Sequence, residues 1–123
     1  MDFAIQSSRP IWQQLTEQLR RRIVTGVYPA GSRFPTVREL AAEAGVNPNT
    51  MQRAMSQLES DGLVITNRTL GRTVTDREDV LEEMRRRLAA ERTEEYFKDM
   101  ETLGYDRAAA AELARSEGGR TDE

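Results

Sequence analysis

The sequence of 123 residues contains no cysteine and no histidine. Disulfides, thiolate or imidazole metal sites, and catalysis by Ser–His or Cys–His pairs are therefore excluded. Carboxylates are plentiful, but they lie among arginines on amphipathic segments, which is typical of solvated or ion-paired helix faces rather than of acid–base catalysis. We therefore expect no enzymatic activity, no metal site and no cofactor.

Long apolar runs are also missing. No stretch is long enough to span a bilayer, and Met1 is not followed by the apolar core of a signal peptide. We therefore expect a cytoplasmic protein with no membrane partner. At this length, and with 37% hydrophobic residues, the chain has room for one compact domain and a small appendage.

Negative charge prevails overall, with a formal net charge of −3, but it is unevenly distributed. Residues 1–76 contain 9 arginines against 7 carboxylates, whereas residues 77–123 contain 9 basic residues against 14 carboxylates. A modest positive balance on one face is enough to attract DNA, and we expect the acidic tail to point away from phosphates.

The segment from Thr36 to Ala54 carries the signals of two short helices joined by a tight turn. Thr36 and Glu39 can form a capping box at the start of the first helix, and Gly45 suits its C-terminus. Asn47 is a favoured N-cap for the second helix, and Pro48 is a favoured first helical residue. This order of signals predicts a helix-turn-helix.

The second of these helices is amphipathic. Its buried stripe is predicted at the spacing of three and four residues: Met51, Ala54, Met55 and Leu58. Its opposite face carries side chains that can bond base edges or phosphates: Asn49, Gln52, Arg53 and Ser56, with Thr50 at the flank. An ordinary surface helix shows the same periodicity, but the doubly capped turn favours a helix that enters a major groove.

Further segments complete a recognisable pattern. A proline-led helix opens at Arg9-Pro10 and is expected to run to Gly26, and residues 28–41 resemble a Pro-Gly-x-x-Leu-Pro-Ser-x-Arg-x-Leu-Ala element with Ala30 inserted. Residues 46–50 match a turn, and residues 53–54 and 58–63 match a recognition helix and its exit. In these segments the chain resembles the DNA-binding domain of the GntR family of bacterial transcription regulators.

This resemblance implies that Arg38 and Arg53 contact DNA. A guanidinium is a planar fork of donors that can bind guanine O6 and N7 or clamp a phosphate. The same resemblance suggests further contacts from Asn47, Asn49, Thr50 and Gln52, although Asn47 is also needed as a cap.

A hairpin is predicted after Gly62, with strands at residues 63–66 and 72–75 and a loop at residues 67–71. By resemblance it is the wing, in which Gly71 can approach the minor groove and Arg68 or Arg72 can contact phosphates. Thr69 and Leu70 depart from the family pattern, and solvated hairpin ends are the alternative for both arginines.

The first helix has a predicted buried stripe of Ile11, Leu15, Leu19, Ile23 and Val24. The three consecutive arginines Arg20, Arg21 and Arg22 are therefore expected to fan across its exposed side, where one or two can reach a DNA backbone. Trp12 lies next to the stripe and is expected to pack rather than to stack on bases.

The tail predicts two helices. Apolar residues recur from about Arg77 to Leu103 and favour one long amphipathic helix ending at Gly104. Asp106 can cap a second helix over residues 108–114. Because so thin a hairpin cannot bury its own apolar face, we expect a symmetric homodimer through residues of about 80–114.

Together these features predict a mostly helical α+β fold: a winged helix-turn-helix DNA-binding domain at residues 1–76, a two-helix dimerisation hairpin at residues 77–117, and a disordered tail at residues 118–123. The short tail resembles the YtrA-like branch of the family. We expect a regulator of double-stranded DNA, a repressor by family tendency. Two alternatives stay open: a switch that responds to an unnamed small-molecule effector, and a winged-helix adaptor for another protein.

Overall fold

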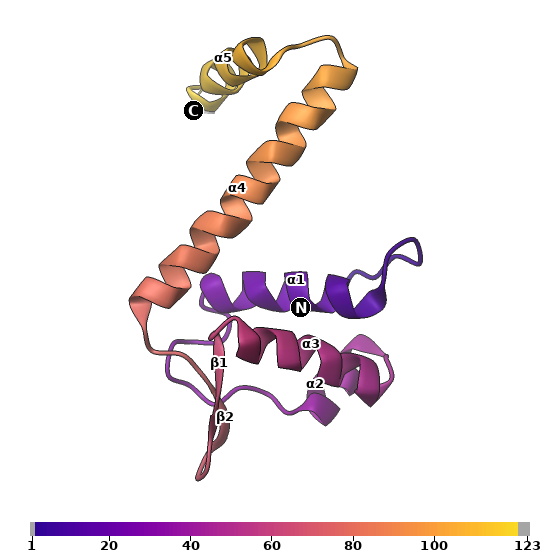
Figure 1. Ribbon diagram of the computed structural model, residues 1–123, viewed down its shortest axis with the longest axis vertical. Helices are drawn as coiled ribbons and strands as arrows, with labels where there is room; N and C mark the ends of the chain where they lie inside the picture. The colour runs from indigo at the N-terminus through magenta and orange to yellow at the C-terminus, as the bar shows by residue number, and fades with distance from the viewer. Residues whose placement is uncertain (1, 121–123) are drawn as a thin grey trace. The chain divides into compact units, whose positions relative to one another are not determined.

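The computed structural model describes residues 2–120. Its elements follow in the order α1 (Ile11–Val24), α2 (Val37–Ala44), α3 (Pro48–Ser60), β1 (Val64–Asn67), β2 (Gly71–Val74), α4 (Glu78–Thr102) and α5 (Arg107–Gly118), as Figure 1 shows. The fold is mostly helical with one small sheet, as predicted. None of the helices in residues 2–120 has the length and hydrophobicity needed to cross a membrane.

Contacts divide the chain into two compact units, residues 1–85 and residues 86–123. In the first unit, α1 and α2 both pack against α3. The predicted stripes of α1 and α3 are buried, except that Ile11 is 41% exposed because it is the first residue of α1 and precedes the core. The core of this unit also includes Phe34, Leu40, Leu63, Val64, Val74, Leu81 and Met84.

The two strands form an antiparallel hairpin in which Val64 pairs with Val74 and Asn67 with Gly71. The strands lie one residue closer to the turn than predicted. The segment before α2 extends the sheet, since Gly31 donates its N–H to the carbonyl of Val74 and Phe34 to that of Arg72. The hairpin is thereby fixed to the residues that lead into α2.

The prediction for the three consecutive arginines of α1 was wrong, because only Arg21 is exposed. Arg20 donates two hydrogen bonds to Asp61 at the end of α3, at 2.8 and 3.0 Å. Arg22 donates to Glu43 at 2.9 Å and to the Tyr28 hydroxyl at 2.6 Å. Burial disfavours the charged form of Arg22, but these hydrogen bonds outweigh it and raise its pKa above the usual value.

The second unit contains most of α4 and all of α5. The Asp106 carboxylate accepts the N–H of Ala109 at 2.8 Å, which confirms the predicted cap, and the Tyr96 hydroxyl donates to the carbonyl of Ala110 at 2.7 Å. The helix α5 continues to Gly118, beyond the predicted end, with an ion pair between Arg115 and Glu112 in its last turns. Of the predicted disordered tail, residues 121–123 lie outside the described residues.

We predict that Asp61→Ala lowers the free energy of unfolding by about 3–5 kcal/mol, because it leaves the Arg20 guanidinium buried without its counter-charge. Glu17→Ala is the matched control. It also removes a carboxylate from an arginine, but both side chains of the Arg9–Glu17 pair are more than two-fifths exposed, so the expected loss is within about 1 kcal/mol. Urea unfolding measures both values, and equal losses would contradict the prediction.

Candidate nucleic-acid interface

The turn between α2 and α3 is built by local capping. The Thr36 hydroxyl accepts the N–H of Glu39 at 3.1 Å, but within the described residues the Glu39 carboxylate makes no return bond to the Thr36 N–H, so only half of the predicted capping box forms. Gly45 ends α2 with a left-handed φ of 68°. The Asn47 side-chain oxygen accepts the N–H of Asn49 at 2.7 Å, and Pro48 follows as the first residue of α3. These bonds confirm the helix-turn-helix predicted from the sequence.

The outer face of α3 is polar, as its periodicity predicts. Asn49, Gln52, Arg53 and Ser56 are exposed, and Thr50 is half-buried. The Gln52 amide donates to the Ser56 hydroxyl at 3.3 Å. Because the side-chain oxygen of Asn47 is used by the cap, its amide nitrogen is the part left for a ligand. The face therefore presents amide, hydroxyl and guanidinium groups, the donors and acceptors that match base edges.

Ion pairing separates the arginines of the first unit into two groups. Most pair with carboxylates, but within residues 2–85 five have no carboxylate partner: Arg21, Arg33, Arg38, Arg53 and Arg68. Of these, Arg38 lies in the first turn of α2, Arg53 on α3 and Arg68 in the hairpin loop. The positive charges left uncompensated thus lie mainly in the elements expected to contact DNA.

The hairpin is tied to α3 by Glu59. One oxygen of this carboxylate accepts from the Thr66 hydroxyl on β1 at 2.8 Å, and the other accepts from Arg72 on β2 at 3.1 Å. The structure therefore places Arg72 in an ion pair rather than free at the surface. Glu59 sets the orientation of the wing relative to the recognition helix.

The tip of the hairpin is shaped by Asn67, whose side-chain oxygen accepts the N–H groups of Thr69 and Leu70 at 2.9 and 3.1 Å. Gly71 follows with a φ of 80°, a conformation that favours glycine, and a Cβ there would meet open space. Arg68 and Leu70 are exposed at this tip. The tip therefore combines one charge with one apolar side chain.

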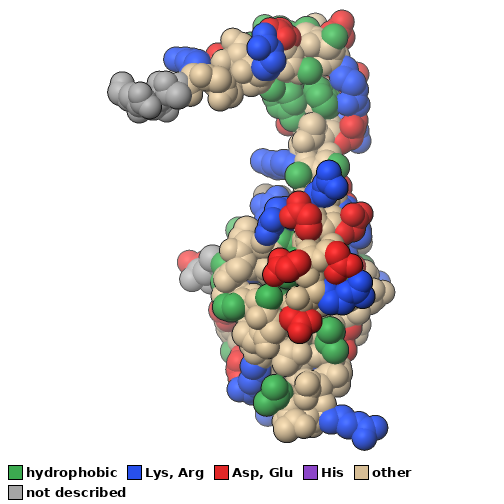
Figure 2. All heavy atoms as spheres, turned by 90° about the vertical axis from the view of Figure 1, so that its left-hand side faces the viewer, with side chains coloured by type: hydrophobic (Ala, Val, Ile, Leu, Met, Phe, Trp, Pro, Cys, Tyr) green, Lys and Arg blue, Asp and Glu red, His purple; other side chains and the backbone are tan. Residues whose placement is uncertain are grey.

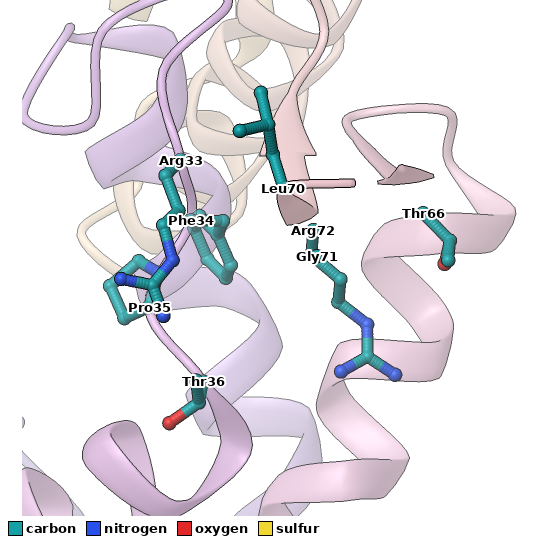
Figure 3. A pocket seen from close by; sticks show the side chains of 8 residues that line it. All are labelled: Arg33, Phe34, Pro35, Thr36, Thr66, Leu70, Gly71 and Arg72. Atoms are coloured by element: carbon teal, nitrogen blue, oxygen red, sulfur yellow. The ribbon is translucent and has the colours of Figure 1, made fainter. Parts of the chain in front are cut away.

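A cavity of about 300 Å³ lies between the hairpin and the segment before α2 (Figure 3). Its lining includes Arg33, Phe34, Pro35 and Thr36 from that segment, and Thr66, Leu70, Gly71 and Arg72 from the hairpin. Arg33 was not among the residues predicted from the sequence to contact DNA. The only signal for it was its position three residues before the Thr36 cap, whereas its pairing with Thr73 across the sheet is a long-range contact.

These groups offer hydrogen bonds and positive charge. Within the part of the chain that the structure describes, no three carboxylates are grouped so that they could hold a metal ion. No buried side-chain polar atom in this part lacks a hydrogen-bond partner. The arrangement therefore suits a polyanionic ligand that approaches the exposed donors from outside.

Comparisons with known proteins agree with this geometry. Residues 12–74 match the family model described as "Bacterial regulatory proteins, gntR family". The chain is 38% identical over 104 residues to the uncharacterized HTH-type transcriptional regulator YhcF of Bacillus subtilis, covering 85% of this chain and 86% of YhcF. It is 36% identical over 70 residues to the HTH-type transcriptional repressor YtrA of the same organism, covering 57% and 54%.

Among solved structures, a GntR family transcriptional regulator from Listeria monocytogenes is similar with a TM-score of 0.80 and 32% sequence identity. The similarity covers 91% of this chain and 98% of that one, so it includes the C-terminal helices as well as the helix-turn-helix.

We predict that Glu59→Ala loosens the wing, because Thr66 and Arg72 lose their shared acceptor. Amide hydrogen exchange should become faster in residues 64–74, with a loss of about 1 kcal/mol in total stability. Glu39→Ala, which removes an exposed carboxylate from the first turn of α2, should leave exchange in the hairpin unchanged. Unchanged exchange in the Glu59 variant would show that the sheet alone fixes the wing.

Proposed function

The chain belongs to the gntR family of bacterial regulatory proteins and is a transcriptional regulator of the helix-turn-helix type; from this premise we propose that it is a repressor that binds a palindromic operator as a homodimer in the cytoplasm. The observation that carries the proposal is the polar outer face of α3 among arginines without carboxylate partners. We place base reading on this face, and phosphate contacts at its margins.

Assignments follow from each side chain's position. We assign Asn49, Thr50 and Gln52 to base edges, with the free amide nitrogen of Asn47 beside them. Arg38 approaches the groove from the first turn of α2, and Arg68 and Gly71 from the wing. Arg72 contributes only if DNA competes with Glu59 for its guanidinium. Arg33 joins the set as a phosphate contact, because it is unpaired and lies between α2 and the wing.

The homodimer is supported by the apolar side chains that the second unit leaves uncovered. Within residues 86–120 only Ala110 is a buried hydrophobic residue, whereas Leu103 is 70% and Tyr105 42% exposed. Figure 2 shows hydrophobic side chains gathered on the helices of this second unit. A second copy can cover them, and a two-fold dimer presents two recognition helices to the halves of a palindrome. We therefore propose residues 77–117 as the dimerisation region, after a DNA-binding domain at residues 1–76.

Repression requires no activity of the protein beyond binding to DNA. A small dimer that occupies a promoter can exclude polymerase without any activating contact. Its resemblance to the repressor YtrA points the same way. Transcription in vitro from a promoter that carries the bound site should fall as the protein is added, and a rise would make it an activator.

The protein-interaction adaptor differs from this proposal in its chemistry. An adaptor needs an apolar or aromatic anchor at the centre of its interface, and the exposed residues of α3 within Pro48–Ser60 include none at the positions of the polar face. The salt dependence of binding distinguishes the two functions. The affinity for duplex DNA should fall steeply as the salt concentration rises, whereas an adaptor's affinity for its protein partner should not.

We predict that selection from random duplexes yields a palindrome with half-sites about one helical turn apart. Arg38→Ala should cost about 1–3 kcal/mol if Arg38 reads a base, and should relax one position of each half-site. Arg33→Ala should instead weaken binding to every duplex alike and lower the salt slope by about one. Arg21→Ala, which removes an unpaired arginine from α1, is the control for net charge. Failure of the wild type to enrich any sequence would refute specific DNA binding.

We predict a solution mass of two chains at micromolar concentration, measured by light scattering. Leu103→Glu should shift the mass toward one chain, because it places a charge in the proposed interface without disturbing a residue that is buried in the single chain. Val27→Glu changes a similarly apolar residue of the first unit, 43% exposed, and should leave the mass unchanged. A monomeric wild type would overturn the homodimer.

A further inference from the structure

Three arginines in residues 2–120 stack on aromatic rings. The guanidinium carbon of Arg22 lies 4.0 Å from the centre of the Phe3 ring, that of Arg53 4.2 Å from Trp12, and that of Arg107 4.3 Å from Phe97. Stacking of this kind holds a flexible side chain in one orientation. The three distances are similar, but the three guanidinium groups differ in their hydrogen bonds.

Two of these guanidinium groups are also bound at their edges. Arg22 donates to Glu43 and Tyr28, and Arg107 donates to Glu94 at 2.6 Å. Arg53 donates to no acceptor within the described residues. The Trp12 ring covers one face of the guanidinium, and Arg53 is an exposed residue of α3. Arg22 and Arg107 therefore stabilise the fold, whereas Arg53 is held in place with its donors free for an external anion.

The position of the Trp12 ring indicates which anion the Arg53 guanidinium binds. Trp12 belongs to α1, and α1 packs along one side of α3. Successive residues of an α-helix are about 100° apart, so Arg53 and Gln52 project in different directions, and stacking draws Arg53 toward the α1 side. When the polar face of α3 enters a major groove, a side chain on the α1 side of α3 lies nearer to the sugar–phosphate backbone than to the base edges.

We propose that Trp12 is a positioning residue that orients the Arg53 guanidinium toward a phosphate of the DNA backbone, at the margin of the groove that α3 enters. Base reading is then left to Asn49, Thr50 and Gln52. This proposal rests on the DNA-binding function above and makes the Arg53 contact independent of sequence. A planar fork held by a ring loses little conformational entropy when it clamps a phosphate.

A double-mutant cycle on the 123-residue chain tests the proposal, with the selected duplex and several salt concentrations. Arg53→Ala should weaken binding about tenfold on matched and mismatched duplexes alike, and lower the salt slope by about one. Trp12→Leu should weaken binding about two- to fivefold when Arg53 is present and have no effect in the Arg53→Ala background. Trp12→Phe, which keeps a ring, should restore most of the affinity.

Arg21→Ala is the matched control for charge. Arg21 lies nine residues after Trp12 on α1, about half a turn round the helix, so its removal should change the salt slope less than the removal of Arg53. Trp12 is the single tryptophan of the chain, and its fluorescence gives a second measurement that needs no change at Trp12. Emission should change when DNA is added to the wild type, and this change should largely disappear in Arg53→Ala.

The results of these experiments distinguish a failure of the Trp12 positioning role from a failure of the proposed DNA-binding function. Equal loss from Trp12→Leu in both backgrounds would show that Trp12 only packs, and would overturn its positioning role while DNA binding stands. If Arg53→Ala relaxes one base position instead of weakening all duplexes, Arg53 reads a base and the phosphate assignment is wrong. If the wild type binds no duplex in the same assays, the proposed function itself fails.

Discussion

The site depends on the ion pair between Arg20 and Asp61 at the C-terminal end of α3. Asp61 is almost completely buried, and its carboxylate accepts from Arg20 on α1 and from Gln57 on α3 itself. Two residues earlier, Glu59 accepts from both strands of the β-hairpin. Two carboxylates at one end of the recognition helix thus orient it against α1 and orient the wing against it. The polar face of α3 keeps a fixed position because both neighbours are fastened to the same end.

Carboxylates also decide which positive charges remain available to a ligand. The chain has a net charge of −3, which argues against DNA only if its arginines are equivalent. They are not, because most are neutralised locally and the unpaired ones include Arg33, Arg38, Arg53 and Arg68. Charges that are already paired contribute little to the field felt by a phosphate at a distance. The electrostatic character of the interface therefore follows from the pairing pattern rather than from the total charge.

Local signals in the sequence predicted most of the fold, because caps and helical periodicity act over three or four residues. Thr36, Asn47 and Asp106 form the caps expected of them, and the stripes of α1 and α3 are buried apart from Ile11. The errors arose where a residue far along the chain determines the outcome. Asp61 and Glu43 bury Arg20 and Arg22, which periodicity alone placed at the surface. Two other contacts between residues distant in sequence were also not predicted: the pairing of Arg33 with the β-hairpin and that of Arg72 with Glu59.

The proposed dimerisation region affects how tightly the DNA-binding domains hold an operator. A domain with few unpaired arginines and a short reading face gains only a modest binding free energy from one half-site. Joining two such domains makes the second contact intramolecular, so the affinity of the pair exceeds that of each domain without any new contact. The gain requires a connection stiff enough to hold both readers at the spacing of a palindrome. In this chain a single continuous helix, α4, begins at Glu78 directly after the wing and runs into the second unit. In the homodimer proposed above, residues 77–117 therefore serve DNA binding as well as dimerisation, because they join two readers of single half-sites into one reader of both.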